Sequence, residues 1–304
     1  VVSNGAKHSL FNALHAVCNP GDEVLLPAPY WVSYYELIKM AGATPVLVTA
    51  TEENGYLVTA QQLKDAITDK TKALILNSPC NPTGAVYPDG RLMEIAALAV
   101  EKDIYVISDE IYECLVYDGA VHTSIASFGP EIKDLTVVVN GLSKAYAMTG
   151  WRIGYTASNR RIATAMANFQ SHATSNANSI AQAASIAALD GDKNEQRSMI
   201  SEFSRRRQYM MARISAINGI NAVNPRGAFY IFANISGLFG KSCDGHIINS
   251  AMDFSSLLLE KANVAVVPGE AFGDARCIRL AYATDMQSII KAMDRIEGFV
   301  NSLT

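Results

Sequence analysis

Lys144 is the residue of this sequence whose position most favours covalent chemistry. It follows an apolar run at residues 135–139 and lies in the segment S-K-A-Y-A-M-T-G-W-R, in which Arg152 comes eight positions later. A lysine amine adds to a carbonyl carbon to form an imine only while it is neutral, which requires partial burial or nearby cations. An isolated lysine is usually a surface charge, but the mostly apolar flanks and the nearby arginine favour a nucleophilic amine here.

Asp109 ends a second apolar run, at residues 104–108. A carboxylate at the end of a buried strand is costly unless a cation pairs with it. The protonated nitrogen of a heterocyclic ring is such a cation, and the pair would keep the ring electron-withdrawing. The Ser-Asp-Glu sequence would equally suit the N-cap of a following helix. The sequence alone leaves both interpretations open.

Asn81 and Tyr112 are candidate hydrogen-bond donors to the same ring. Asn81 precedes Pro-Thr-Gly and follows the apolar run at residues 73–77. This pattern also suits an ordinary turn. Tyr112 comes three residues after Asp109. Two donors to a phenolate oxygen would lower the pKa of an adjacent imine and favour its reactivity at neutral pH.

Gly5, Ala6 and Lys7 stand at the start of a predicted helix at residues 7–17. Small residues at a helix N-terminus leave backbone N–H groups accessible, and such groups bind phosphate. Arg152 is a candidate for the matching cation. The sequence therefore predicts an anion site where this helix begins.

Trp31 and Arg279 complete the set of candidate residues. Trp31 follows Pro-Tyr and offers a flat face for stacking on a ring, although ordinary core packing would also explain it. Arg279 lies in the apolar segment C-I-R-L-A-Y, where a guanidinium needs an anionic partner. A bidentate carboxylate ligand fits that need, and so does a buried structural ion pair.

Short apolar runs alternate with helical patterns over the first two thirds of the chain. Strands that are almost entirely apolar and alternate with helices indicate a parallel sheet covered on both faces. Such sheets bind ligands at the carboxyl ends of their strands, where the candidate residues lie. The predicted strands are residues 24–26, 45–49, 73–77, 104–108, 135–139 and 152–157, with amphipathic helices at 35–41 and 90–102.

The pattern changes near residue 201 and predicts a smaller α+β domain. We expect a large domain at residues 1–205 and a small one at residues 206–304. The predicted helices of the second part are residues 202–217, 250–262 and a last one after Asp285, with strands at 228–233, 264–267 and 278–281.

Composition excludes several classes of function. The formal net charge is −4 and there is no basic block, which disfavours binding to nucleic acid or to an anionic membrane. The cluster Arg205–Arg207 is interpreted as a solvated helix face. Five widely spaced cysteines without C-x-x-C indicate free thiols and a cytoplasmic protein rather than a disulfide frame or a metal site. No G-x-G-x-x-G follows the first strands, which disfavours a dinucleotide dehydrogenase.

These motifs, in this order, resemble the class I/II aminotransferases of fold type I, and the resemblance runs along essentially the whole chain. The finer pattern is similar to bacterial-type aspartate aminotransferases and their relatives acting on prephenate. The matching segments are N-S-P-C-N-P-T-G at residues 77–84, S-D-E-I-Y at 108–112, S-K-A-Y-A-M-T-G-W-R-I-G at 143–154, G-A-F-Y at 227–230 and R-L-A-Y-A-T at 279–284.

The resemblance implies pyridoxal 5'-phosphate as the cofactor, with Lys144 as its imine-forming lysine and proton shuttle. It implies that Asp109 pairs with the pyridine nitrogen, that Tyr112 and Asn81 hold the ring oxygen, and that Trp31 stacks on the ring. The phosphate would be held by Gly5, Ala6 and Arg152. The substrate would be held by Trp31, Asn81, Arg279 at its α-carboxylate and Lys7 at its distal carboxylate.

The implied activity is transamination by a ping-pong mechanism. The donor would be aspartate or glutamate, and the acceptor 2-oxoglutarate, oxaloacetate or prephenate. The resemblance also implies a homodimer. A β-lyase or decarboxylase on the same scaffold, and a non-catalytic regulator domain that binds the cofactor, are the alternatives.

Two departures from the family pattern stand out. Many relatives carry a phosphate-binding serine three residues before the lysine, where this chain has Gly141. Relatives also carry a long segment before the position of Val1, including a glycine near the substrate and a tyrosine donated across the dimer. We therefore expect this chain to be either a fragment of a longer protein or a truncated form with impaired activity.

Overall fold

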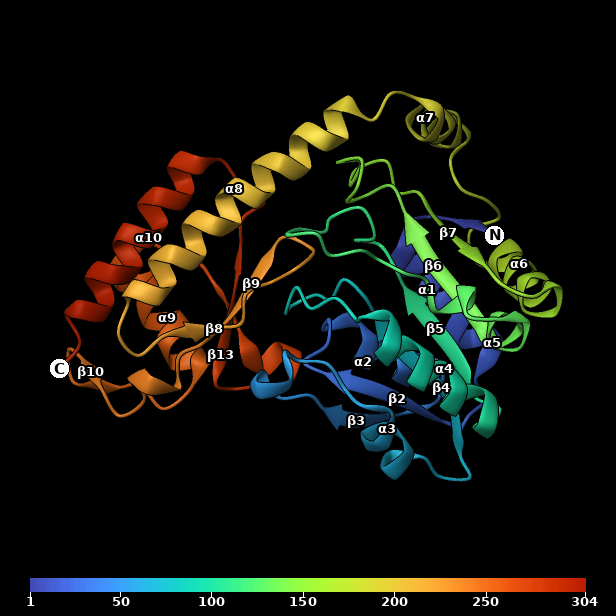
Figure 1. Cartoon of the computed structure of the whole chain (residues 1–304), viewed down its shortest axis with the longest axis horizontal. Helices are drawn as coiled ribbons and strands as arrows, with labels where there is room; N and C mark the ends of the chain where they lie inside the picture. The colour runs from blue at the N-terminus through green and yellow to red at the C-terminus, as the bar shows by residue number, and fades with distance from the viewer.

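The computed structural model describes residues 1–304 as two helix-covered sheets joined by one long helix (Figure 1). The larger sheet has seven strands in the order β1-β7-β6-β5-β4-β2-β3. Its strands are β1 Val2–Ser3, β2 Glu23–Ala28, β3 Thr44–Thr49, β4 Thr71–Asn77, β5 Tyr105–Asp109, β6 Thr136–Gly141 and β7 Gly154–Ala157.

Strands β2 to β6 are parallel. At one edge β7 runs antiparallel to β6, and β1 pairs antiparallel with β7. Side chains of β4 alternate between two cores, since Leu74 and Leu76 enter one and Ala73 and Ile75 the other. Both faces are covered by helices, which explains the almost wholly apolar strands. One face carries α1 Ala6–Val17, α2 Ser33–Met40 and α6 Arg160–Ala173, and the other carries α3 Ala60–Ala66, α4 Asp89–Lys102 and α5 Pro130–Leu135.

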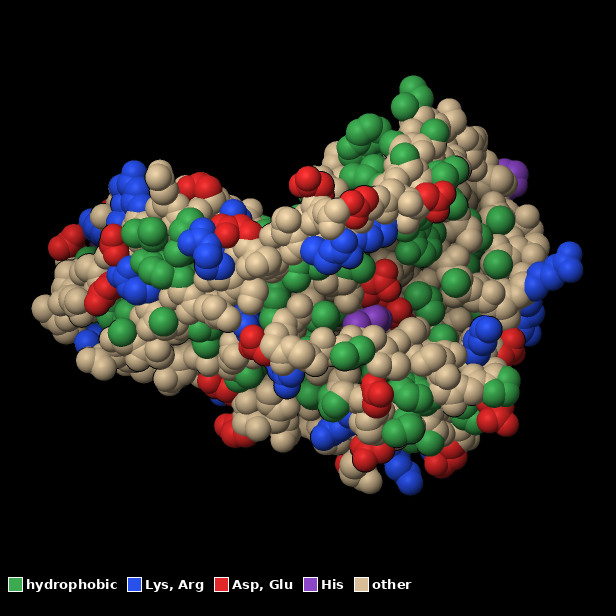
Figure 2. All heavy atoms as spheres, turned by 45° about the horizontal axis from the view of Figure 1, so that its top comes forward, with side chains coloured by type: hydrophobic (Ala, Val, Ile, Leu, Met, Phe, Trp, Pro, Cys, Tyr) green, Lys and Arg blue, Asp and Glu red, His purple; other side chains and the backbone are tan.

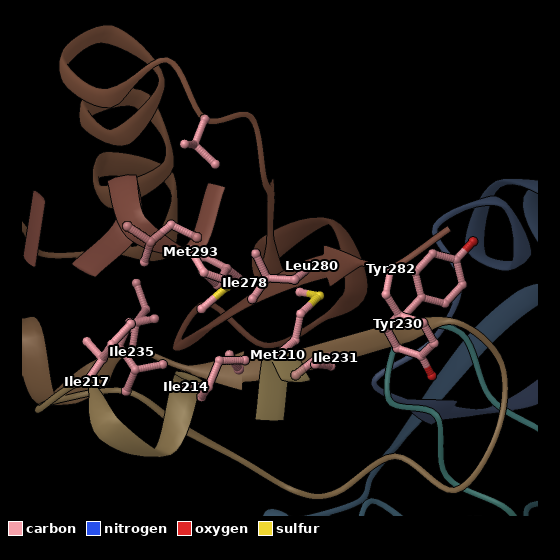
Figure 3. Close-up of a cluster of buried hydrophobic side chains, with 14 of the residues drawn as sticks. Met210, Ile214, Ile217, Tyr230, Ile231, Ile235, Ile278, Leu280, Tyr282 and Met293 are labelled. Carbon is pink, nitrogen blue, oxygen red and sulfur yellow. The ribbon is translucent and has the colours of Figure 1, made fainter. Parts of the chain in front are cut away.

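The smaller sheet is antiparallel, in the order β12-β13-β9-β8. Its core is built from side chains such as Met210, Ile231 and Met293 (Figure 3). Phe232 belongs instead to a core of the larger sheet, so the two parts share apolar contacts. The strands are β8 Asn221–Ala222, β9 Tyr230–Asn234, β12 Val267–Pro268 and β13 Cys277–Ala281, and the helices α8 Asn194–Ala216, α9 Ala251–Ala262 and α10 Met286–Asn301.

The remaining elements are short or peripheral. No helix of the chain combines the length and the apolar character needed to cross a bilayer. These elements are helix α7 Ser179–Asp190, the hairpin β10 Ser242–Cys243 with β11 His246–Ile247, and the 3-10 turns η1 Glu52–Asn54, η2 Ile125–Ser127, η3 Ser236–Leu238 and η4 Gly269–Phe272.

The predicted α/β fold with a mostly parallel sheet is confirmed, but several boundaries differ. Helix α8 begins at Asn194, well before the predicted residue 202. The predicted strand at residues 264–267 is wrong except for its last residue, because Val264 N–H still bonds to Leu258 O at the end of α9. Strand β7 begins only at Gly154, since Arg152 has a φ of 55°, outside the extended region.

The interpretation of Arg205–Arg207 as a solvated face is wrong for one of its members. Arg205 is exposed and pairs with Glu202, as a solvated residue would. Arg207 is 1% exposed and pairs with Asp118, a residue of the other part of the molecule. Consecutive residues of a helix point about 100° apart, so three identical side chains in a row cannot share one environment.

Candidate active site

A cavity of about 360 Å³ lies between the two parts of the molecule, at the carboxyl ends of β4 to β6. Of the predicted site residues, every one except Gly5 lines it, and Gly5 contacts one of the lining residues, Arg152. The lining residues are Ala6, Lys7, Leu10, Trp31, Tyr34, Asn77, Asn81, Asp109, Ile111, Tyr112, Ser143, Lys144, Thr149, Arg152, Tyr230 and Arg279.

The amine of Lys144 is half-buried and makes no hydrogen bond or ion pair within the chain. It lies 5.9 Å from the ring centroid of Tyr112 and 5.3 Å from that of Phe229. Burial lowers the pKa of the Lys144 amine, and the positive charges of Arg152 and Arg279 lower it further. The lysine therefore has the raised fraction of neutral amine that imine chemistry needs.

Asp109 is 3% exposed at the end of β5. One carboxylate oxygen accepts a hydrogen bond of 2.6 Å from the Tyr34 hydroxyl, and the other accepts one of 3.2 Å from the Ile111 N–H. Burial raises the pKa of Asp109 to about 6, although both hydrogen bonds oppose the rise. No helix follows, so the helix-cap interpretation is wrong. The carboxylate forms no ion pair within the chain, although the positive charge of Lys144 also lowers its pKa.

Asn81 is held from both sides and keeps its amide nitrogen free. Its backbone N–H donates to Asn77 Oδ1 at 2.9 Å, and its own Oδ1 accepts from Arg279 at 2.9 Å. The hydroxyl of buried Tyr112 lies 3.1 Å from that of Tyr230. Asn81 Nδ2 and one hydroxyl proton of the tyrosine pair remain available to a ligand in the cavity.

Helix α1 begins at Ala6, and its N-cap residue Gly5 lies beside the guanidinium of Arg152. Gly5 has a φ of 87°, and a Cβ there would collide with the Arg152 guanidinium. The first turn of α1 has no acidic residue, and Arg152 donates only to Thr149 O, at 3.0 Å. A helix N-terminus and a guanidinium without a carboxylate partner thus face the same space, which suits a phosphate group.

Arg279 is half-buried on β13 with no carboxylate partner. Its guanidinium stacks 4.5 Å from the ring centroid of Tyr230 and 4.8 Å from that of Phe272. Its Nε has no hydrogen-bond partner, and burial lowers the pKa of the guanidinium. The buried structural ion pair considered from sequence is therefore wrong. A cation left unpaired in a cavity is arranged for an anionic ligand.

Comparison with known proteins supplies the family. Residues 1–296 match the model of the family described as aminotransferase class I and II. The chain belongs to the class I and II aminotransferases. It is 47% identical over 300 residues to the aspartate aminotransferase of Bacillus sp. strain YM-2, covering 99% of this chain and 76% of the relative. It is 44% identical to the aspartate/prephenate aminotransferase of Cereibacter sphaeroides, over 100% of this chain and 76% of the relative.

Solved structures agree with the aminotransferase assignment. The aspartate aminotransferase of Rhizobium meliloti superposes with a TM-score of 0.97 at 41% identity, over 100% of this chain and 76% of that one. The Thermus thermophilus aspartate aminotransferase with maleate gives 0.90 at 40% identity, over 99% and 75%. The protein is thus a pyridoxal-phosphate-dependent aminotransferase, and its residues fit that cofactor. The cavity offers an amine with a lowered pKa, an unpaired carboxylate and an anion site.

Trp31 and Lys7 line the open side of the aminotransferase cavity. Trp31 is partly exposed and packs edge-on against Tyr34, with ring centroids 5.2 Å apart. The amine of Lys7 is exposed and lies 4.9 Å from the Trp31 ring centroid. Trp31 also packs against a core of the larger sheet, so core packing, the alternative considered from sequence, stays open beside stacking on a ligand.

Several residues of the site were missed from sequence. Tyr34, Asn77 and Tyr230 all contact predicted site residues. Tyr34 follows Trp31 by three residues, a spacing that places both on one side of the helix start and could have indicated it. A Cβ at Gly141 would lie 2.8 Å from Ile153 O, so this backbone leaves no room for a side chain at the position where the family resemblance led us to expect a serine.

Proposed function

We propose that this aminotransferase exchanges the amino group between a dicarboxylic amino acid, aspartate or glutamate, and a 2-oxo acid such as 2-oxoglutarate, oxaloacetate or prephenate. The observation that carries the proposal is the unpaired guanidinium of Arg279 in the same cavity as the Lys144 amine. The names of the similar proteins agree with such substrates, and maleate, in one of them, is itself a dicarboxylate.

We propose that Arg279 binds the α-carboxylate of the substrate as a bidentate partner, held in place by Asn81 and by the two flanking rings. Lys7 would then meet the distal carboxylate at the open side of the cavity. An exposed amine gives a weaker and more adaptable contact than a buried guanidinium, which suits substrates of two lengths.

We propose the following cofactor-binding roles. The cofactor supplies an electron sink for the carbanion that forms when the substrate loses its α-proton. Asp109 would meet the ring nitrogen, and Tyr112 and Asn81 the ring oxygen. Trp31 would stack on the ring. Gly5, Ala6 and Arg152 would hold the phosphate, by the N–H groups at the start of α1 and by the guanidinium.

Lys144 is proposed to hold the cofactor before the reaction and to carry the proton during it. A neutral amine accepts a proton on Nζ, and the resulting ammonium returns it within the same cavity. The lowered pKa of Lys144 favours the accepting form at neutral pH. Leu10 and Ile111 line the cavity on the apolar side and limit the access of water.

We propose that the protein works as a homodimer in the cytoplasm. Ile180 and Ile186 on α7 are 73% and 62% exposed, and Trp151, next to the phosphate-site residue Arg152, is 48% exposed. Figure 2 shows hydrophobic side chains gathered on the upper right of the molecule, the part that carries α7 in Figure 1. Exposed apolar patches of this kind mark association surfaces. All five cysteines carry free thiols, as in reducing compartments.

We also propose that residues 1–205 act as the cofactor-binding domain and residues 206–304 as a smaller domain. Support comes from the separate sheets, one in each range. The proposed boundary lies inside α8, a continuous helix of 23 residues, so the two parts would be joined by a rigid element instead of a flexible linker.

The deciding experiment is a panel of amino donors and 2-oxo acids, with the absorbance of the bound cofactor followed as each donor is added. Aspartate and glutamate should convert the cofactor stoichiometrically, and a 2-oxo acid should reverse the change. The variant Lys144→Ala should lose turnover and the lysine-bound cofactor. Ammonia and pyruvate as main products would indicate a lyase, and undiminished transamination by Lys144→Ala would refute the assignment.

A further inference from the structure

Three connecting segments that carry site residues meet beside the cavity. Residues 78–84 carry Asn81, and residues 110–118 carry Tyr112. Residues 224–230 lead into β9 and end at Tyr230, whose hydroxyl meets that of Tyr112. Apart from the first residue of β9 these segments lie outside helices and sheets, so the positions of their side chains depend on contacts between the segments.

Backbone hydrogen bonds join the three segments. Gly84 O accepts from the N–H groups of both Arg226 and Gly227, each at 2.9 Å. Tyr117 N–H donates to Arg226 O, also at 2.9 Å. A Cβ on Gly84 would collide with Pro225, so the first and third segments touch directly. The third segment is therefore bonded to both of the others, and the junction of residues 78–84, 110–118 and 224–230 forms a crossing of three segments.

One guanidinium fastens this crossing from the side of α8. Arg207 Nη2 donates to both carboxylate oxygens of Asp118, each at 2.7 Å. Its Nη1 donates to Asn224 Oδ1 at 3.1 Å and to Pro225 O at 2.7 Å. Its guanidinium carbon lies 4.9 Å from the ring centroid of Tyr117. Arg207 is 1% exposed and does not line the cavity, so it does not touch a ligand there.

We propose that Arg207 is a positioning residue of the reaction. It holds the segment of Tyr112 against residues 224–230, which are bonded in turn to the segment of Asn81, and so fixes Asn81 and Tyr112 relative to each other. The proposal rests on the proposed roles of those two residues at the cofactor ring. Loss of the Arg207 guanidinium would leave Asp118 and Pro225 O without their partner. The second and third segments would then be joined only by their remaining hydrogen bonds, such as those from Tyr117 N–H to Arg226 O and from Ala228 N–H to Leu115 O.

A loosened crossing should have a chemical signature as well as a structural one. Two donors to the ring oxygen lower the pKa of the lysine-bound cofactor, because they favour its deprotonated form. Displaced donors should therefore raise that pKa, by about half a unit or more. A small displacement of aligned groups should also lower kcat by about tenfold. A merely structural arginine would lower the melting temperature and leave the pKa of the cofactor unchanged.

The test uses the cofactor-loaded protein with Arg207→Met, Arg207→Lys and Asp118→Asn. The matched control is Arg205→Met on the same helix, since Arg205 is exposed and pairs only with Glu202. Cofactor absorbance is titrated from about pH 5 to 9, and kcat and KM are measured with the best donor. Arg207→Met should show the raised cofactor pKa and the fall in kcat, Arg207→Lys a smaller change, and the control neither.

The proposal for Arg207 fails if the cofactor pKa and kcat do not change. A folded Arg207→Met protein with a wild-type cofactor pKa and kcat would overturn it, even if its melting temperature fell. If Arg207→Met does not fold, Asp118→Asn and Arg207→Lys decide in the same way, because both keep polar partners in the crossing. A wild-type protein that binds the cofactor without transaminating any donor would instead contradict the proposed function.

Discussion

Two arginines of the second part of the chain, the half-buried Arg279 and the buried Arg207, differ in the groups that neutralise their charge. Both stack on tyrosine rings and both are held by polar groups of connecting segments. Arg207 has a carboxylate partner, Asp118, bound through two oxygens. Arg279 has no carboxylate partner, although the Nε of each arginine lacks a hydrogen-bond partner. The paired cation holds the molecule together, whereas the unpaired one is available to a substrate.

The physical cost of the two arrangements explains the difference. Removing a charge from water is expensive, and an ion pair with good geometry offsets most of that cost. An unpaired buried charge is a net cost to the folded state. Two unpaired charges in the cavity, those of Arg279 and Asp109, lower the stability of the folded state in this way. A bound ligand with an anionic group near Arg279 and a cationic group near Asp109 would offset both costs.

The largest effect is expected from Arg279→Leu. The variant should lose about 100- to 1000-fold in kcat/KM for aspartate, because a buried charge pair to the substrate is worth about 3–4 kcal/mol. The free energy of unfolding of its cofactor-free form should be unchanged or higher, opposite to Arg207→Met. Steady-state kinetics and urea denaturation measure the two quantities. Arg276→Leu, which removes an exposed guanidinium from its pair with the largely buried Asp274, is the control. A lower free energy of unfolding in Arg279→Leu would show that Arg279, like Arg207, stabilises the fold.

The second effect is a gain in stability from Asp109→Asn. The pKa of Asp109 is about 6 in the folded chain against an ordinary value of 3.8, so its ionisation costs stability as the pH rises from 4 to 6. Above pH 6 that cost is constant, on the order of 2 kcal/mol. The cofactor-free variant should therefore be more stable than the wild type at pH 7.5 and lose this advantage near pH 4. Denaturant titrations at both pH values check the sign, and a pH-independent difference would contradict it.

A smaller effect is expected from Lys7→Met. Its exposed amine should add about 1 kcal/mol to the binding of a distal carboxylate, so kcat/KM should fall about fivefold to tenfold for aspartate and glutamate. Alanine, which lacks that carboxylate, should be used as before. Lys39→Met is a fitting control, because Lys39 also lies over a ring, that of Tyr35. Equal losses for alanine and aspartate would exclude a role at the distal carboxylate.

The smallest effect is expected from Tyr34→Phe. Loss of its 2.6 Å hydrogen bond removes one of the two contacts that favour the ionised form of Asp109. The pKa of Asp109 should rise, so the acid limb of the pH–activity profile should move to higher pH by about half a unit. Tyr56→Phe removes a buried hydroxyl from contact with Cys277 and should leave the limb in place. An unmoved limb in Tyr34→Phe would show that the hydrogen bond is only structural.

The residues that line the cavity could be predicted from sequence, but the Arg207–Asp118 pair could not. Asn81, Asp109 and Lys144 each follow an apolar strand, and the carboxyl ends of parallel strands meet at one edge, so their convergence follows from the pattern. Arg207 and Asp118 are 89 residues apart, and neither lies in a pattern that pairs them. Helical periodicity shows that three consecutive arginines point in different directions, but not which one meets a partner.

The backbone conformation at strand ends also could not be predicted from sequence. Arg152 and Ala228 have φ values of 55° and 57°, and both stand just before the observed strands β7 and β9, which therefore begin later than predicted. Non-glycine residues rarely adopt this conformation, and no local signal marks them. The lack of room for a side chain at Gly141 could not be predicted either. The atom that a Cβ there would meet, Ile153 O, is brought close by the pairing of β6 with β7.

The contact between Gly5 and Arg152 couples two positions that are 147 residues apart in the sequence. The space that a Cβ at position 5 would occupy is already filled by the guanidinium. A side chain at position 5 would therefore displace the end of Arg152, whereas a shorter residue at position 152 would open that space. The effects of substitutions at the two positions should therefore not be additive.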